Sequence, residues 1–226
     1  MNYSKFWQLS NSILIMKKSL IACLLLLMAG SALAQATTDA QAKAIVDKAV
    51  AQLQRTPRRY TFTTTYTAGR TGDKQVQSGV CAINGKKTYV KFAGMETFFD
   101  GTTQWVFMPD NNEVSVSEPT PAEQRESNPL LMVRDYAQTH RVGFDEDTDA
   151  ENFMVCLYPT IAKQVEYFRI KLSIDKKTYA LRRIEFCQRN ADRIVLTIDS
   201  QQPLPKEFQF VFDPKQHPDV EVNDLL

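Results

Sequence analysis

The fold of this chain is decided by residues 98–116, FFDGTTQWVFMPDNNEVSV, together with residues 128–131, NPLL. The first stretch contains an Asp-Gly turn, a short alternating strand with Trp105, a Pro-Asp-Asn turn and a second alternating strand. At residue 128 the pattern changes to a short capped apolar helix. An extended sheet beside a separate apolar helix is one way to build a hydrophobic cavity with a cover.

Alternation of apolar and polar residues predicts ten strands in the chain. In the first strand the rings of Tyr60, Phe62 and Tyr66 alternate with threonines, so all three rings lie on one face. Asn-Gly and Asp-Gly turns join the early strands, which predicts antiparallel hairpins. The predicted strands are residues 59–67, 74–83, 86–92, 95–99, 104–108, 113–117, 152–158, 165–175, 179–187 and 193–201.

Two segments favour helix instead. Residues 38–54 repeat apolar side chains at intervals of three and four, and Pro57 ends this pattern. In the second segment, near residues 128–134, Ser127 or Asn128 is the cap and Pro129 occupies the first helical position.

These elements predict a fold of the α+β class that is mainly β. A sheet of roughly ten strands curls rather than staying flat, and its concave side then needs the two helices as cover. We therefore expect one domain in which a single strongly curved antiparallel sheet forms an incomplete β-barrel, closed by a helical lid.

Residues 1–34 are typical of a cleaved secretory signal peptide. A basic segment at residues 16–18 precedes an almost wholly apolar run at 21–29, and Ala34 completes a cleavage site of small residues. We expect cleavage after Ala34, which leaves residues 35–226 as the mature domain in the periplasm.

Two alternatives remain open in this region. Translation from Met16 gives a complete signal peptide by itself, whereas translation from Met1 extends its basic end. A lipobox-like sequence at residues 20–23 offers Cys23 as a lipid-anchored N-terminus instead of cleavage after Ala34.

The charge balance excludes a nucleic-acid partner. Loss of residues 1–34 removes three of 27 basic residues and none of 26 acidic ones, so the mature chain is mildly acidic. Its length of roughly 190 residues suits one domain with a sizeable core, and we expect a monomer.

Three cysteines remain in the mature chain: Cys81, Cys156 and Cys187. An odd number in an oxidising compartment requires at least one free thiol or an intermolecular pair. Their apolar surroundings favour buried thiols, and a disulfide between Cys156 and Cys187 remains the alternative.

No catalytic, metal or cofactor site is predicted. His140 and His217 have no nucleophile or metal ligand at a recognised spacing, and the acidic residues at 145–149 lack the pattern of a calcium loop. Instead the chain is rich in apolar side chains, with 13 Phe, 8 Tyr, 7 Met and 2 Trp. A cavity for acyl chains needs such area, because each buried CH₂ contributes about 0.8 kcal/mol.

A family resemblance supports this interpretation. The signal peptide, the first helix, residues 100–109, residues 128–131 and the closing segment 205–210, PKEFQF, occur in this order over nearly the whole mature chain. In this set the chain resembles the outer-membrane lipoprotein carrier protein (LolA) family. The resemblance implies a periplasmic shuttle that takes acylated lipoproteins from an inner-membrane ABC-type exporter to the outer membrane, without a covalent step. Whether an outer-membrane acceptor is a further partner stays open.

The residues and the resemblance together give a set of expected binding residues. Family members carry an arginine after the second strand that fastens the lid to helix carbonyls. Here Lys86 and Lys87 stand in its place, either as a lid latch without the planar fork of arginine or as a solvated hairpin end. The expected acyl-binding residues are Tyr60, Phe62, Tyr66, Tyr89, Trp105, Leu130, Leu131 and Met132.

Two other functions fit the same fold. One is a regulatory module that senses envelope stress and binds an anti-sigma factor, a type of protein that usually carries an additional C-terminal domain. The other is a generic lipid-binding protein, which only identification of the ligand distinguishes from a lipoprotein carrier.

Overall fold

The computed structural model describes residues 38–55, 57–147, 149–161, 163 and 165–225. The predicted signal peptide, residues 1–34, lies outside the described residues. The chain divides into two compact units, residues 1–41 and 42–226. Residues 38–41 of the first unit are helical, and the following description concerns the second unit by itself. None of the helices in the described part of the chain has the length and apolar character needed to cross a bilayer.

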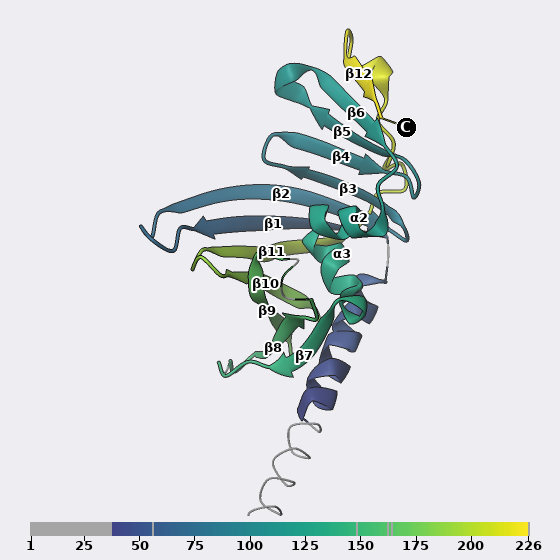
Figure 1. Ribbon diagram of the computed structural model, residues 1–226. Helices are drawn as coiled ribbons and strands as arrows, with labels where there is room; N and C mark the ends of the chain where they lie inside the picture. The colour runs from purple at the N-terminus through teal and green to yellow at the C-terminus, as the bar shows by residue number, and fades with distance from the viewer. Residues whose placement is uncertain (1–37, 56, 148, 162, 164, 226) are drawn as a thin grey trace, which may run out of the picture. The chain divides into compact units, whose positions relative to one another are not determined.

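The described part of the second unit contains one sheet of twelve strands (Figure 1). Their order across the sheet is β12-β6-β5-β4-β3-β2-β1-β11-β10-β9-β8-β7, so the two edge strands do not pair and the barrel is incomplete, as predicted. The strands are β1 Arg58–Thr67, β2 Lys74–Asn84, β3 Lys87–Phe92, β4 Met95–Phe99, β5 Gln104–Met108, β6 Glu113–Ser117, β7 His140–Phe144, β8 Asn152–Pro159, β9 Tyr167–Asp175, β10 Leu181–Gln188, β11 Arg193–Pro203 and β12 Glu221–Asp224.

All ten predicted strands are present, with ends that differ by two residues or fewer. Strands β7 and β12 were not predicted, because they are short and lie at the two edges of the sheet. The expectation of a purely antiparallel sheet is wrong at one place, since β12 runs parallel to β6. A parallel pair needs a long connection, and residues 118–220 lie between β6 and β12.

Three α-helices accompany the sheet in the described part of the chain. The first, the leading helix, continues through residues 42–53 of this unit, and α3 spans Pro129–Arg134. Between them in sequence lies α2, Pro121–Ser127, which was not predicted although a capping box opens it: Thr120 and Glu123 accept hydrogen bonds from each other's backbone. Short 3₁₀ helices lie at Pro109–Asn111, Tyr136–Gln138 and Pro214–Gln216.

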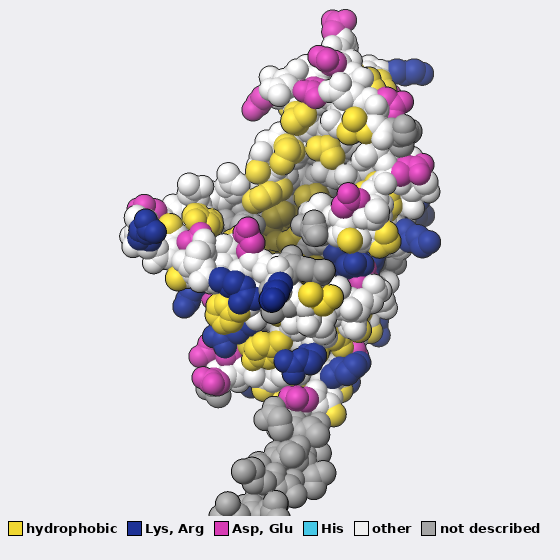
Figure 2. Space-filling model, in the orientation of Figure 1, with side chains coloured by type: hydrophobic (Ala, Val, Ile, Leu, Met, Phe, Trp, Pro, Cys, Tyr) yellow, Lys and Arg dark blue, Asp and Glu magenta, His cyan; other side chains and the backbone are white. Residues whose placement is uncertain are grey.

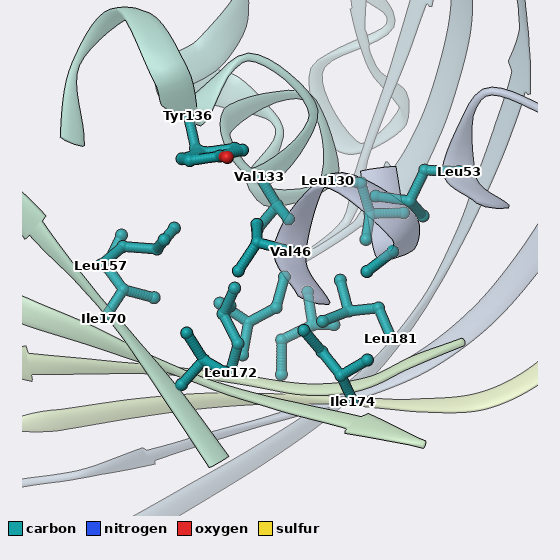
Figure 3. Close-up of a cluster of buried hydrophobic side chains, with 14 of the residues drawn as sticks. Val46, Leu53, Leu130, Val133, Tyr136, Leu157, Ile170, Leu172, Ile174 and Leu181 are labelled. Atoms are coloured by element: carbon teal, nitrogen blue, oxygen red, sulfur yellow. The ribbon is translucent and has the colours of Figure 1, made fainter. Parts of the chain in front are cut away.

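The main core lies between two of these helices and the concave face of the sheet. The leading helix contributes Val46 and Leu53, and α3 contributes Leu130 and Val133 (Figure 3). These four side chains meet strand residues on the same face, and all of them are nearly inaccessible to solvent. The strand residues include Leu157, Ile170, Leu172, Ile174, Leu181 and Ile184.

The opposite, convex face is covered by the chain between β11 and β12. Phe210 and Phe212 from this segment are buried, and Phe212 packs on Phe107 with ring centroids 5.0 Å apart. Ala82 and Val114 lie beneath the same segment. Strands β2 to β5 therefore carry apolar side chains on both faces, whereas β6 is apolar on the convex face alone.

Candidate functional site

One row of paired residues runs across the concave face from β1 to β5. Tyr60 pairs with Cys81, Cys81 with Val90, Val90 with Thr97, and Thr97 with Val106. Tyr60 and Cys81 are buried beneath the helices, whereas the other three are half-buried. The helices thus cover β1 and β2. On the same face Thr88 of β3 and Phe99 of β4 are also buried, so the accessible part of β3 to β5 is the part around Val90, Thr97 and Val106.

Apolar side chains gather where this cover ends. Figure 2 shows them in a hollow of the surface on the face that carries the helices. By the strand register, Phe92, Met95, Val106 and Met108 share this concave face, and Met95 is 43% exposed. An accessible concave apolar surface of this kind is suited to flexible hydrocarbon chains.

A cavity of about 490 Å³ lies beside the helices, on the other half of the same face. Its exposed rim is formed by Gln138, Thr160 and Ile161, with Arg125 half-buried beside them. Its walls are mostly apolar and come from α2, α3, the β8–β9 connection and the strands: Ala122, Pro129, Met132, Thr139, His140, Pro159, Val165, Tyr167, Phe186 and Ile194.

His140 forms a polar part of this wall whose hydrogen bonds are satisfied within the protein. Its Nδ1 lies 2.8 Å from the Thr139 hydroxyl and its Nε2 lies 3.0 Å from the Tyr167 hydroxyl. The Tyr167 hydroxyl in turn donates to the Met132 sulfur at 3.8 Å. Burial lowers the pKa of His140 to about 4, so its imidazole is neutral at pH 7.

Tyr60 and Phe62 lie on the concave face, as predicted, but deep in the core. Tyr60 is 1% exposed, its hydroxyl has no hydrogen-bond partner among the described residues, and burial raises its pKa to about 12. Phe62 lies over Gly79 of β2, where a Cβ would come within 2.4 Å of the ring, and packs 5.6 Å from Phe92. Phe62 therefore links the core to the accessible concave face.

The other predicted concave-face residues are spread along its length. Leu130 and Leu131 are buried, and Met132 lines the cavity. Tyr66 pairs with Ile194, another lining residue, and its hydroxyl donates to Asp192 at 2.7 Å. Met132 thus forms part of the cavity wall, and Tyr66 lies beside the wall residue Ile194.

Tyr89 and Trp105 lie on the convex face, so the prediction that they share the cavity side is wrong. Tyr89 pairs with Ala82, the residue next to Cys81, and its ring packs 5.3 Å from Phe208. Trp105 packs against the cluster around Phe212. Alternation in β3 and β5 places both residues one position away from the concave row.

Lys86 and Lys87 are exposed at the hairpin that joins β2 and β3. Their role as a lid latch remains a prediction. The described contacts that fasten the helices lie elsewhere: the Tyr136 hydroxyl donates to Asp47 of the leading helix at 2.6 Å, and the Asn128 amide donates to the Cys81 sulfur at 3.6 Å.

All three cysteines of the described chain are buried free thiols. Cys156 lies on β8 and Cys187 on β10, with β9 between them. Two strand spacings amount to about 9.6 Å, which exceeds the reach of a disulfide. The alternative of a disulfide between Cys156 and Cys187 is therefore excluded in this fold.

Sequence reasoning missed the residues that complete the cavity. His140 has no partner at a recognised spacing in the sequence, yet Tyr167 contacts it from 27 residues away. Phe186 and Ile194 were assigned to strands without a role, and Arg125 lies on the unpredicted α2. Among the described residues, no group of three or more His, Cys, Asp or Glu side chains could hold a metal ion.

The chain is similar to one known protein family and to several solved structures. Residues 31–190 match the family described as outer membrane lipoprotein carrier protein LolA. An uncharacterized conserved protein from Thermus thermophilus is 12% identical, with a TM-score of 0.51 over 81% of this chain and 99% of that one. A LolA superfamily protein from Nitrosomonas europaea is 15% identical, with a TM-score of 0.44 over 76% and 98%. A search of curated proteins gave no match.

Proposed function

Because this chain belongs to the outer membrane lipoprotein carrier protein (LolA) family, we propose that it binds the acyl chains of lipoproteins and shuttles them from the inner to the outer membrane. Membership of the family indicates a lipid- or lipoprotein-binding protein of the cell envelope. The shuttle would work in the periplasm, receive its cargo from an ABC-type exporter and deliver it at the outer membrane, with or without an acceptor protein.

The concave apolar face carries this proposal. Acyl chains gain free energy by leaving water, about 0.8 kcal/mol for each buried CH₂, and need few hydrogen bonds in return. The half-buried side chains of Val106 and Met108, together with the 490 Å³ cavity beside α3, offer such a surface. Flexible methionines such as Met132 let the surface adapt to chains of different shape.

We propose that transfer is physical, with no catalytic step and no cofactor. The polar side chains in the cavity wall are hydrogen-bonded to one another, as His140 is to Thr139 and Tyr167. Because these polar groups are already hydrogen-bonded within the protein, they need no hydrogen bond from an acyl chain. The acyl chain would then be held by burial of its apolar surface alone, and its release would break no hydrogen bond.

Recovery of cargo from the cell envelope tests the proposal. The mature protein is purified from envelope extracts after crosslinking, and mass spectrometry identifies what comes with it. We expect intact acylated lipoproteins with the wild type. Val106→Asp places a charge on the accessible concave face and should lose them, whereas Val76→Asp should retain them, because Val76 is 63% exposed on the other face of β2. Recovery of free lipids alone, with no lipoprotein after crosslinking, would contradict the carrier function.

A further inference from the structure

The rim of the 490 Å³ cavity carries a positive charge that no described acidic residue neutralises. Arg125 lines the cavity from the last turn of α2, and its Nη1 lies 3.5 Å from the Gln138 side-chain oxygen. None of the described lining residues is Asp or Glu, and Arg125 takes part in none of the ion pairs among the described residues. Since His140 is neutral at pH 7, Arg125 is the charge that a ligand meets in the described lining.

The cavity becomes apolar away from this rim. Gln138 and Thr160 are exposed beside the half-buried Arg125, whereas Phe186 and Ile194 come from the sheet. Its volume lies in the lower half of the range of about 300–1,000 Å³ for single small-molecule sites. Space of this size suits one hydrocarbon chain rather than several.

From this arrangement we propose that the cavity binds a single-chain amphiphile with an anionic head, its hydrocarbon tail on Met132 and Phe186 and its carboxylate or phosphate at Arg125. The proposal rests on the acyl-binding role proposed above and adds a ligand class to it. The acyl groups of a lipoprotein are attached through neutral linkages, so Arg125 would distinguish an ionised fatty acid or lysophospholipid from them. A guanidinium provides the planar, paired donors that suit carboxylate and phosphate oxygens.

Titration calorimetry of the mature protein tests this proposal with palmitate and the uncharged monopalmitoylglycerol, which have the same chain. The wild type should bind palmitate about tenfold more tightly, the change expected from one charge-assisted hydrogen bond. Arg125→Gln should lose this preference and keep its affinity for monopalmitoylglycerol. Arg141→Gln removes the same charge from an exposed site outside the cavity lining and should bind both ligands as the wild type does.

Three further ligands show which anionic group is bound, and they distinguish failure of this proposal from failure of the carrier function. Palmitoyl lysophosphatidic acid should share the preference, whereas inorganic phosphate alone should not bind measurably, because the tail supplies most of the affinity. Equal wild-type affinity for palmitate and monopalmitoylglycerol, or an undiminished preference in Arg125→Gln, would overturn the anionic-head site. A triacylated lipopeptide tested in parallel reports on the carrier function: its failure to bind, with the palmitate preference intact, would count against that function alone.

Discussion

His140 is held in the cavity wall as a neutral imidazole, and this has a consequence for stability. The residue is 6% exposed, and burial lowers its pKa from 6.5 to about 4. Because the folded-state pKa lies below the unfolded value, protonation favours the unfolded chain. The stabilising contribution is fully present above about pH 6.5 and is lost as the pH falls toward 4.

Replacement of His140 should remove this pH dependence. We expect the free energy of unfolding of the wild type to fall by about 2 kcal/mol more than that of His140→Gln between pH 7 and pH 4.5. Denaturant titrations at the two pH values measure both changes. The carboxylates titrate alike in both proteins and cancel in the comparison. Equal losses in the two proteins would show that His140 is not the group responsible.

Asn128 joins the short helix α3 to the sheet. Its side-chain oxygen accepts a hydrogen bond from the Leu130 N–H at 3.0 Å, and its amide donates to the Cys81 sulfur at 3.6 Å. Asn128→Ala should therefore cost about 1–2 kcal/mol of unfolding free energy, as the loss of a buried cap does.

A serine at this position separates the two contacts of Asn128. Asn128→Ser keeps a capping oxygen and loses the contact with Cys81, so denaturant unfolding should show a smaller cost than for alanine. If alanine and serine destabilise equally, the cap is not what Asn128 contributes.

Single residues also mark the limit of prediction from the sequence. Tyr60, Phe62 and Tyr66 were placed correctly on one face, because one strand is enough to define their alternation. Tyr89 and Trp105 were not, since β3 and β5 are apolar on both faces and only the pairing register relates them to Tyr60. The contact of His140 with Tyr167 was equally hidden, because Tyr167 lies on β9, 27 residues away.

At the scale of elements, the segment between β11 and β12 explains why both faces of β2 to β5 are apolar. Phe212 is 3% exposed and contacts the rings of Phe98, Phe107 and His217. Its neighbour Val211 is 43% exposed. The segment therefore acts as a second covering layer, on the face opposite the helices.

Truncation of Phe212 should destabilise the protein strongly. Phe212→Ala is expected to lower the free energy of unfolding by about 3 kcal/mol, the cost of a cavity left by a buried ring. Val211→Ala, at the adjacent exposed position, should cost less than about 0.5 kcal/mol. Chemical denaturation of both variants makes the comparison. Similar small losses would mean that the segment does not cover the sheet as described.

Elements with a strong local pattern were predictable from the sequence, whereas those defined by tertiary pairing were not. The ten alternating strands, the leading helix and the Asn128 cap of α3 all follow from neighbours in the sequence. Strands β7 and β12 exist because long-range pairing reaches them, and each is five residues or fewer. Helix α2 could have been found from its capping box at Thr120 and Glu123.

At the scale of the second unit, the sheet order and the coverage of its two faces together define the binding surface. The edges β12 and β7 do not pair with each other, and the helices cover β1, β2 and part of β8 to β11. On the concave face of β3 to β5, the part around Val90, Thr97 and Val106 stays accessible. The sequence predicted the curved sheet and its helical lid. How far the lid extends depends on packing between distant segments, which no local pattern reveals.

Photolabelling with a triacylated lipopeptide that carries a diazirine in one acyl chain tests the central claim most directly. After irradiation of the complex, peptide mass spectrometry identifies the labelled side chains. We predict labels on the concave face, at Met132, Phe186, Val106 and Met108. Labels concentrated at Tyr89 and Trp105, on the convex face, would contradict the claim that the concave face binds acyl chains.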